Sequence, residues 1–349
     1  MKKRLKFLDR FLTVWIFLAM VIGIGIGYLF PSVSAIIDNL SDGTTNIPLA
    51  IGLILMMYPP LVKVDFKKIP AVFAKPKILL LSFIITWIIG PLLMCALAVL
   101  FLSNHLGYLT GLIIIGIAPC IAMVIVWSEL AEGNRELTAG LIGINSLLQI
   151  AFFSLYAYFY LEIVLPLFGI NGLSIDVSIA HIAQTVGVYL GIPFALAILS
   201  RWVILKTKGE VWLNSHFIPA ISPITLIALL STIVLMFCLK GQMIVSLPLD
   251  VLKVGLPLIF YFGIMFTLMF FVAKYFGADY RDNAALSFTA AGNNFELAIA
   301  VSIGVFGVNS DQAFAGVIGP LVEVPALILL VRVINFWKKK YYIKKRSLS

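Results

Sequence analysis

Long, uninterrupted runs of apolar residues limit the fold of this chain more than any other feature of its sequence. Of its 349 residues, 62% are hydrophobic and only 12% are charged. Typical soluble domains are about 45–50% apolar and about 25% charged. A water-soluble fold of this composition would leave extended apolar surface exposed to solvent. The composition therefore argues against a soluble enzyme, a nucleic-acid-binding protein and a disordered chain, and it indicates a polytopic membrane protein.

The length of the apolar runs favours helices over a β-barrel. A helix needs about 20 residues to cross a hydrocarbon core of about 30 Å, whereas barrel strands are segments of about 10 residues with alternating polarity. Helices also satisfy their own backbone hydrogen bonds where water is absent. We therefore predict an all-α polytopic membrane protein with ten transmembrane helices. The expected spans are 11–30, 47–62, 78–102, 107–127, 137–167, 178–200, 218–239, 249–276, 284–306 and 312–335.

Basic residues are concentrated on one side of these spans. If both termini are cytoplasmic, all of the 25 Lys and Arg residues except Lys240 and Lys253 fall in inner segments, as the positive-inside rule requires. The net charge of +9 is therefore assigned to membrane topology and contact with the lipid bilayer, and no nucleic-acid partner is expected. The first span follows a basic stretch without a small-residue cleavage site, which indicates an uncleaved helix. We expect a multi-pass protein of the plasma membrane.

Spans of similar kind follow one another in the same order in the two halves of the chain, residues 1–170 and residues 171–349: a short span, a Pro-containing span, a long span, a Gly-interrupted span and a long span. Pro48 opens the second span, and Pro219 and Pro223 open the seventh. Each half holds five spans, an odd number, so two related halves would be inverted relative to each other in the membrane. We predict two inverted five-helix repeats, the second carrying a basic cytoplasmic tail.

Spans 4 and 9 each carry helix-breaking residues near the middle. Pro119 removes a backbone donor in span 4 and crowds the preceding turn, so a break is expected between Gly116 and Cys120. Gly292 and the two asparagines that follow it are poor helix formers in span 9. Broken helices in corresponding positions of two inverted halves indicate the substrate site of a transporter. The alternative is that neighbouring helices repair two ordinary kinks.

Two glutamates lie inside the predicted spans: Glu296 in span 9 and Glu323 in span 10. An ionisable residue at the centre of a membrane helix costs at least about 2.5–3.5 kcal/mol and indicates a function. A proton or a metal cation is the expected partner, so we predict that both glutamates take part in proton coupling. The alternative is that a protonated glutamate only bonds a neighbouring helix.

Three cysteines, Cys95, Cys120 and Cys238, lie inside apolar runs, without the spacing of a disulfide framework or a CxxC metal site. Cys95 and Cys238 are expected to be packing residues. Cys120 directly follows the break in span 4, where it would face a cavity. A thiol there suits a soft solute such as trivalent arsenic or antimony, or a soft metal ion. The GIGIG segment of span 1 is expected to allow close helix packing.

Five segments, LDRFLTVWIFLAM, IGLILMMYPPLVKVDF, GIAPCIAMVIVW, AAGNNFELAIAVSIGVFG and GPLVEVPALILLV, resemble the arsenite efflux permeases of the yeast-type arsenical-resistance family. That family belongs to the bile acid/auxin/arsenite transporter superfamily. The resemblance implies ten helices in two inverted repeats, with helices 4 and 9 discontinuous and crossed. It also implies export of arsenite, in some members also antimonite, in exchange for protons. The family's essential cysteine and glutamate correspond to Cys120 and Glu296.

Together, the residues and the resemblance give a working hypothesis for the site. Cys120 binds the metalloid through one thiolate, Asn293 and Asn294 hold its oxygens, and no cofactor takes part. The chief alternative is a sodium-coupled symporter of an organic anion, in which Asn293, Asn294 and Glu296 would line a sodium site. A membrane-embedded enzyme is disfavoured because the spans contain no Ser–His, paired-Asp or HExxH arrangement. A passive channel is the third alternative.

Overall fold

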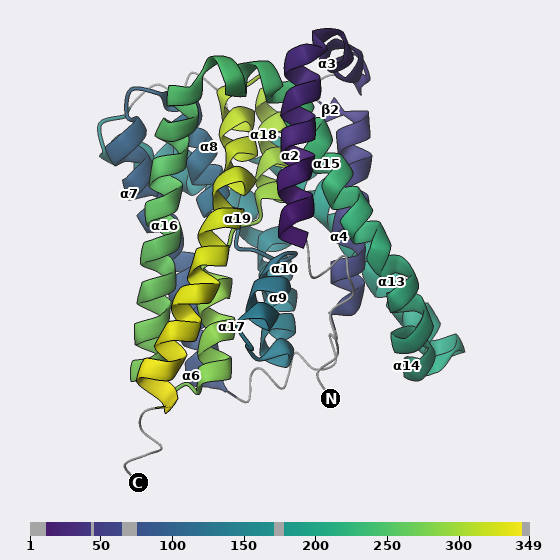
Figure 1. Ribbon diagram of the computed structural model, residues 1–349, viewed down its shortest axis with the longest axis vertical. Coiled ribbons are helices and arrows are strands. Elements are labelled where there is room, and N and C mark those ends of the chain that lie inside the picture. Colours follow the sequence, from purple (N-terminus) through teal and green to yellow (C-terminus); the bar gives the residue numbers. More distant parts are fainter. Residues whose placement is uncertain (1–11, 43–44, 65–74, 171–177, 344–349) are drawn as a thin grey trace.

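The computed structural model describes residues 12–42, 45–64, 75–170 and 178–343, and this part of the chain is almost entirely helical (Figure 1). The basic stretch at 1–10, most of the basic loop at 63–77 and the end of the basic tail lie outside the described residues. The division between the two predicted halves, after residue 170, falls at the edge of another segment outside the described residues, 171–177. Two strands of two residues each, β1 (Ser41–Asp42) and β2 (Thr45–Asn46), form a small antiparallel pair.

The helices fall into two groups. The first, here called the panel, comprises α2 (Leu12–Leu29), α3 (Pro31–Asp38), α4 (Ile47–Lys63), α12 (Ile179–Val186), α13 (Ile192–Thr207), α14 (Gly209–Trp212) and α15 (Ile218–Ser246). The second, here called the core, comprises α6 (Pro76–Phe83), α7 (Gly90–Leu102), α8 (Leu106–Gly116), α9 (Val124–Leu130), α10 (Arg135–Tyr158), α11 (Leu165–Leu167), α16 (Pro248–Tyr275), α17 (Tyr280–Ala291), α18 (Phe295–Phe306) and α19 (Asp311–Lys338). Wider π-helical turns continue several of these helices: η2 (Ile84–Ile89), η3 (Phe159–Val164), η4 (Gly187–Gly191), η5 (Leu213–Phe217) and η6 (Lys339–Ile343).

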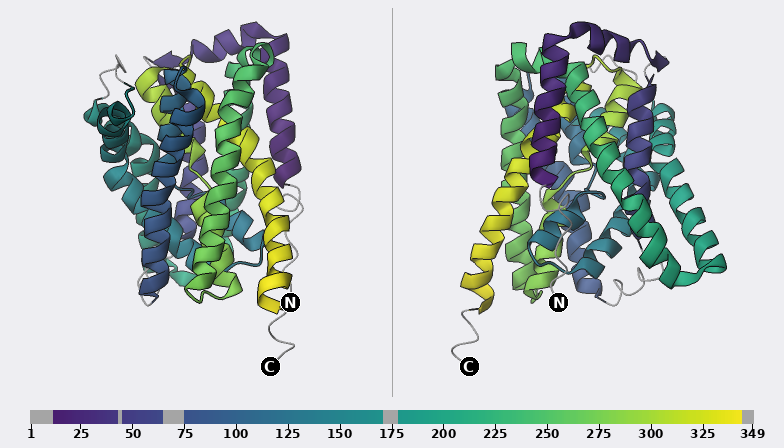
Figure 2. Two further views of the ribbon diagram at one scale, coloured as in Figure 1. Left: turned by 90° about the vertical axis from the view of Figure 1, so that its left-hand side faces the viewer. Right: turned by 45° about the vertical axis from the view of Figure 1, so that its right-hand side comes forward.

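Packing within each group is extensive. In the panel, α15 packs along α2 and α4, and α13 packs on α4 (Figure 2). In the core, α16 contacts α17 and α19, while α8 packs between α7 and α19. Contacts of α12 with α10 and α18 join the two groups. The site described below lies where they face each other.

Each of the ten predicted spans coincides with a helix or with a pair of helices in the structure. Within the described residues, six helices are long and apolar enough to cross a membrane, and a seventh span arises if α2 and α3, bent by 99°, count as one. The remaining apolar helices, Ile47–Lys63, Leu106–Gly116 and Phe295–Phe306, are shorter. The all-helical polytopic architecture therefore agrees with the prediction, whereas ten crossings and an inverted repeat stay predictions.

The glycines of the GIGIG segment allow the closest helix contact in the panel. A Cβ atom on Gly27 would stand 2.1 Å from the carbonyl oxygen of Cys238, and one on Gly23 would stand 2.7 Å from the carbonyl oxygen of Val234. Both distances are far below van der Waals contact, so α2 and α15 approach each other backbone to backbone. The expected role of this segment in close helix packing is confirmed.

Candidate functional site: the crossing of two broken helices

Both predicted helix breaks are present, and they cross each other. Helix α8 ends at Gly116 and α9 begins only at Val124, while α17 ends at Ala291 and α18 begins at Phe295. Between these ends Pro119 and Asn293 face each other as an isolated antiparallel bridge. The breaks therefore form one hydrogen-bonded unit, although they lie far apart in the sequence.

The backbone groups freed by one break are satisfied by the other. The Cys120 amide donates to the Gly292 carbonyl at 3.0 Å, and the Asn294 amide donates to the Ala118 carbonyl at 2.7 Å. Buried backbone groups need partners of this kind because an unpaired group in an apolar interior is costly. The pairing explains how two interrupted helices remain stable in the middle of an apolar bundle.

Side-chain amides reinforce the crossing. The Asn293 Nδ2 group donates to the Ile115 carbonyl at 3.0 Å, at the end of α8. Asn294 caps α18, since its Oδ1 atom accepts from the Leu297 amide at 3.1 Å. Its Nδ2 group donates to Gln149 Oε1 at 2.9 Å. The predicted contact of both asparagines with substrate stays a prediction; in this conformation their amides hold the backbone of the crossing.

Gln149 is a site residue that sequence reasoning missed. Its Nε2 group donates to the Pro119 carbonyl at 2.5 Å, so its side chain links both breaks. Gln149 is fully buried on α10, and Asn145 and Ser146 are buried one turn before it. A cluster of three polar residues inside the fifth apolar span was the sequence signal that could have identified it.

Cys120 lies at the crossing and is buried together with Glu323. A Cβ atom on Gly292 would stand 3.0 Å from the Cys120 Cβ and 3.4 Å from Glu323 Oε1. The same Glu323 oxygen accepts from the Asn293 amide at 3.4 Å. Gly292 therefore makes room for both a thiol and a carboxyl group. Cys95 and Cys238 are also buried and free, but they lie in uninterrupted helices.

A small cavity separates the crossing from the panel. Its volume is about 30 Å³, enough for only one or two water molecules. Core residues on one side include Glu296, Glu323 and Met123, while Thr232 and Met56 are among the panel residues on the other. Glu296 also reaches a second, smaller cavity against α4 and η4. The structure thus brings Glu296 and Glu323 to the interface between the two groups of helices.

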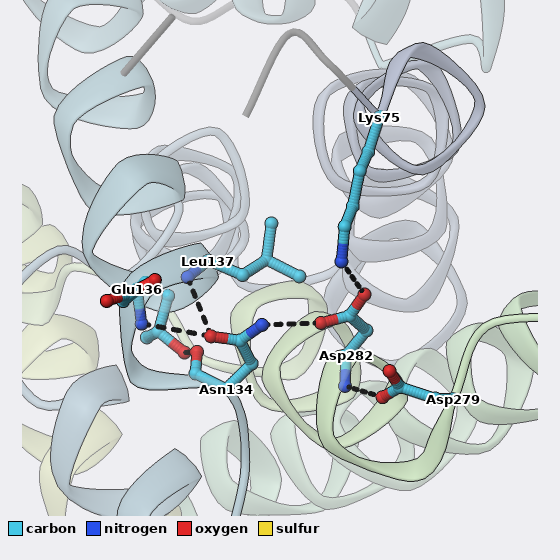
Figure 3. A network of polar contacts seen from close by, with 7 residues as sticks. Lys75, Asn134, Glu136, Leu137, Asp279 and Asp282 are labelled. Carbon is cyan, nitrogen blue, oxygen red and sulfur yellow. Dashed lines mark hydrogen bonds and ion pairs between the residues drawn. The ribbon is translucent and has the colours of Figure 1, made fainter. Parts of the chain in front are cut away.

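A polar network fixes one end of the core, where α6, α10 and α17 meet (Figure 3). Lys75 Nζ lies 2.5 Å from Asp282 Oδ2, and Asn134 Nδ2 donates to Asp282 Oδ1 at 2.7 Å. Asp279 accepts from the Asp282 amide at 2.8 Å, and Asn134 accepts from the Glu136 amide at 3.1 Å. The hydrogen bond that Lys75 donates to Asp282 raises the pKa of Lys75 above its ordinary value. The segment that follows α9 is thereby held against the start of α17.

Comparison with known protein families agrees with this architecture. Residues 50–247 match the model of the family described as the Sodium Bile acid symporter family, a region that contains the first break and most of the panel. The chain belongs to this family. Its relatives include the arsenical-resistance protein Acr3 of Corynebacterium glutamicum, which is 46% identical over 94% of this chain and 89% of its own length.

Two further relatives match over similar lengths. Acr3 of Alkaliphilus metalliredigens is 32% identical over 95% of this chain and 94% of its own length. An uncharacterized transporter of Synechocystis, slr0944, is 34% identical over 95% of this chain and 90% of its own length. The resemblance to arsenical-resistance proteins is therefore confirmed, and the relatives are named as resistance or transport proteins, not as enzymes.

Proposed function

We propose that this protein exports arsenite, and antimonite as a second substrate, across the plasma membrane in exchange for protons, with Cys120 as the thiol that binds the metalloid. Two relatives named as arsenical-resistance proteins support the class of substrate. The observation that carries the proposal is the position of Cys120 at the crossing, next to Gly292 and Glu323. In this proposal all ten helical segments cross the membrane as two inverted repeats, and both termini are cytoplasmic.

The chemistry needs one thiol and no change of oxidation state. Arsenite is a neutral trihydroxy compound near pH 7. An As–S bond to Cys120 forms while one As–O bond breaks, and the thiol proton leaves with the departing hydroxide as water. A soft thiolate suits trivalent arsenic, and a single As–S bond is reversible, so it permits both capture and release. Asn293 and Asn294 would hold the two remaining hydroxyl groups as the crossing rearranges around the bound substrate.

Transport requires the panel and the core to separate. A trihydroxy solute is larger than the one or two water molecules that the cavity of about 30 Å³ can hold, so this conformation is closed around the site. Rocking of one group of helices against the other would open it to each side in turn. Protonation of Glu296 and Glu323 at the interface would favour one of the two states, because a ligand shifts an equilibrium by its differential affinity.

Uptake of arsenite into everted membrane vesicles under an imposed pH gradient tests the proposal. We expect uptake to require the gradient and to be lost in Cys120→Ser. Cys95→Ser and Cys238→Ser are matched controls, because both remove a buried thiol away from the crossing, and both should transport like the wild type at equal protein level. Uptake by Cys120→Ser at the wild-type rate would show that this thiol only packs.

The family description supports a second candidate, sodium-coupled symport of an organic anion. Glu296, Asn293 and Asn294 would then contribute to a cation site. The same vesicles distinguish the two functions. Uptake of a bile acid that depends on a sodium gradient, without arsenite uptake under a pH gradient, would replace arsenite export by this function.

A further inference from the structure

Thr232 is a hydroxyl-bearing residue on the panel side of the cavity. Its side chain is 1% exposed, and it lines the cavity opposite Glu296 and Glu323. Among the described residues its Oγ1 atom has no hydrogen-bond partner. A buried hydroxyl without a partner costs about 1–3 kcal/mol. Such a group at the wall of a transport site indicates a partner that arrives with the substrate.

Several other helical hydroxyl groups in the described part of the chain bond the carbonyl one turn earlier. This pattern is seen for Thr110, Thr138, Ser146, Thr185, Thr207, Ser222 and Thr289. Thr232 departs from it and points across to α4, where a Cβ atom on Gly52 would stand 2.4 Å from its Oγ1. The hydroxyl group therefore occupies the space that a Cβ atom at position 52 would need, at the interface of α15 and α4.

The rest of the panel wall is apolar. Besides Thr232, the lining residues that the panel contributes are Ile16, Met56, Leu229, Ile233 and Met236. Thr232 is therefore the panel's one hydrogen-bonding side chain at this cavity within the described part of the chain. The core contributes both carboxyl groups, and Glu323 and Cys120 both lie next to Gly292 at the crossing.

We propose that Thr232 binds a hydroxyl group of the metalloid held by Cys120; this inference rests on the proposed function. After one As–S bond forms, two As–OH groups remain, and each can accept a hydrogen bond from an asparagine amide while it donates another. A hydrogen bond from one of them to Thr232 connects α15 of the panel to the thiol of the core through the substrate. Thr232 is thus a positioning residue that makes binding sensitive to the relative placement of the two groups of helices.

The KM for arsenite in the vesicle assay tests this inference with three variants. Thr232→Val removes the hydroxyl group at nearly constant volume and should raise KM about five-fold, the value of one neutral hydrogen bond. Thr232→Ser keeps the hydroxyl group and should stay within about two-fold of the wild type. Thr225→Val is the matched control, because Thr225 lies two turns earlier on α15 with a buried Oγ1 that is unpaired among the described residues, and it does not line the cavity.

A competitor without spare hydroxyl groups separates substrate binding from a purely structural role. Dimethylarsinous acid carries one hydroxyl group, which it loses on forming the As–S bond, so it offers Thr232 no partner. Its inhibition constant against arsenite uptake should therefore be unchanged in Thr232→Val. An equal rise of KM and of this inhibition constant, or a wild-type KM in Thr232→Val, would overturn the inference. If Thr232→Val does not reach the membrane, Thr232→Ala replaces it.

The failure of the proposed function has a different signature. If the wild type itself takes up no arsenite under a pH gradient, arsenite export fails and this inference fails with it. If the wild type transports and Cys120→Ser does not, while Thr232→Val behaves like Thr225→Val, only the assignment of Thr232 is wrong.

Discussion

Substitution of Gly292 by alanine tests the tight packing of the crossing directly. The backbone of Gly292 is extended, with φ −80° and ψ 147°, so alanine adopts it without strain and any effect comes from the added methyl group. That group would stand 3.0 Å from the Cys120 Cβ, 3.3 Å from the Phe288 carbonyl oxygen and 3.4 Å from Glu323 Oε1. Because all three neighbours are backbone or buried side-chain atoms, the crossing must shift by a few tenths of an ångström.

Overpacking of this kind costs about 1–3 kcal/mol. If the strain is relieved by moving Cys120 away from its position, affinity for arsenite should fall between about 5-fold and 150-fold. The assay is the KM of arsenite uptake in everted vesicles, with protein level measured in the same membranes. Gly263→Ala on α16 is the matched control, because a Cβ there meets nothing within 4 Å. A Gly292→Ala variant with wild-type KM would refute the packing argument.

Four other outcomes are expected. Asp282→Asn keeps a hydrogen-bond partner for Asn134 but loses the ion pair with the half-exposed Lys75. Thermal unfolding in detergent should therefore show that the free energy of unfolding falls by about 1–2 kcal/mol. In a Lys75→Met background, where the ion pair is already lost, most of this decrease should be absent. Because the pKa of Lys75 is raised in the folded state, its charged form stabilises the fold at pH values below the ordinary lysine pKa of 10.5, and this contribution is lost as the pH rises through the folded-state pKa. The unfolding temperature should therefore fall above about pH 10.5, and it should fall less steeply in Asp282→Asn. Gln149→Met leaves the buried Pro119 carbonyl unpaired and should cost about 1–3 kcal/mol in the same unfolding assay. Glu296→Gln should make arsenite uptake independent of the imposed pH gradient, and gradient-dependent uptake in this variant would contradict its role in proton coupling.

Local chemistry made much of the site predictable from sequence. Pro119 removes a backbone donor, and Gly292 with the asparagines after it is a poor helix former, so both breaks were predicted within a few residues. Glu296 and Glu323 were conspicuous because charge is rare inside spans, and the structure brings both to the same cavity. Apolar runs likewise predicted a helix at each of the ten expected spans, although not the short helices α3 and α14, because a membrane-spanning segment must satisfy its own backbone hydrogen bonds.

Contacts between distant segments were not predictable in the same way. Gln149 joins Pro119 to Asn294 across 30 and 145 residues, and a glutamine inside an apolar run does not reveal its partner. Thr232 escaped notice for the same reason, since threonine is ordinary in a membrane helix and its lack of a bond depends on how α15 meets α4. The number of crossings is also a property of the assembled bundle, because α4, α8 and α18 are shorter than a full span.

The reciprocal hydrogen bonds of the crossing have a consequence for how such proteins evolve and can be recombined. Each break supplies the partners that the other lacks, so neither interruption can be repaired alone. A substitution that restored a continuous helix at 117–123 would leave the Gly292 carbonyl and the Asn294 amide without hydrogen-bond partners. The two breaks must therefore be inherited as a pair. Chimeras that join the first half of one relative to the second half of another should be stable only where both halves keep their breaks, at 118–120 and 292–294.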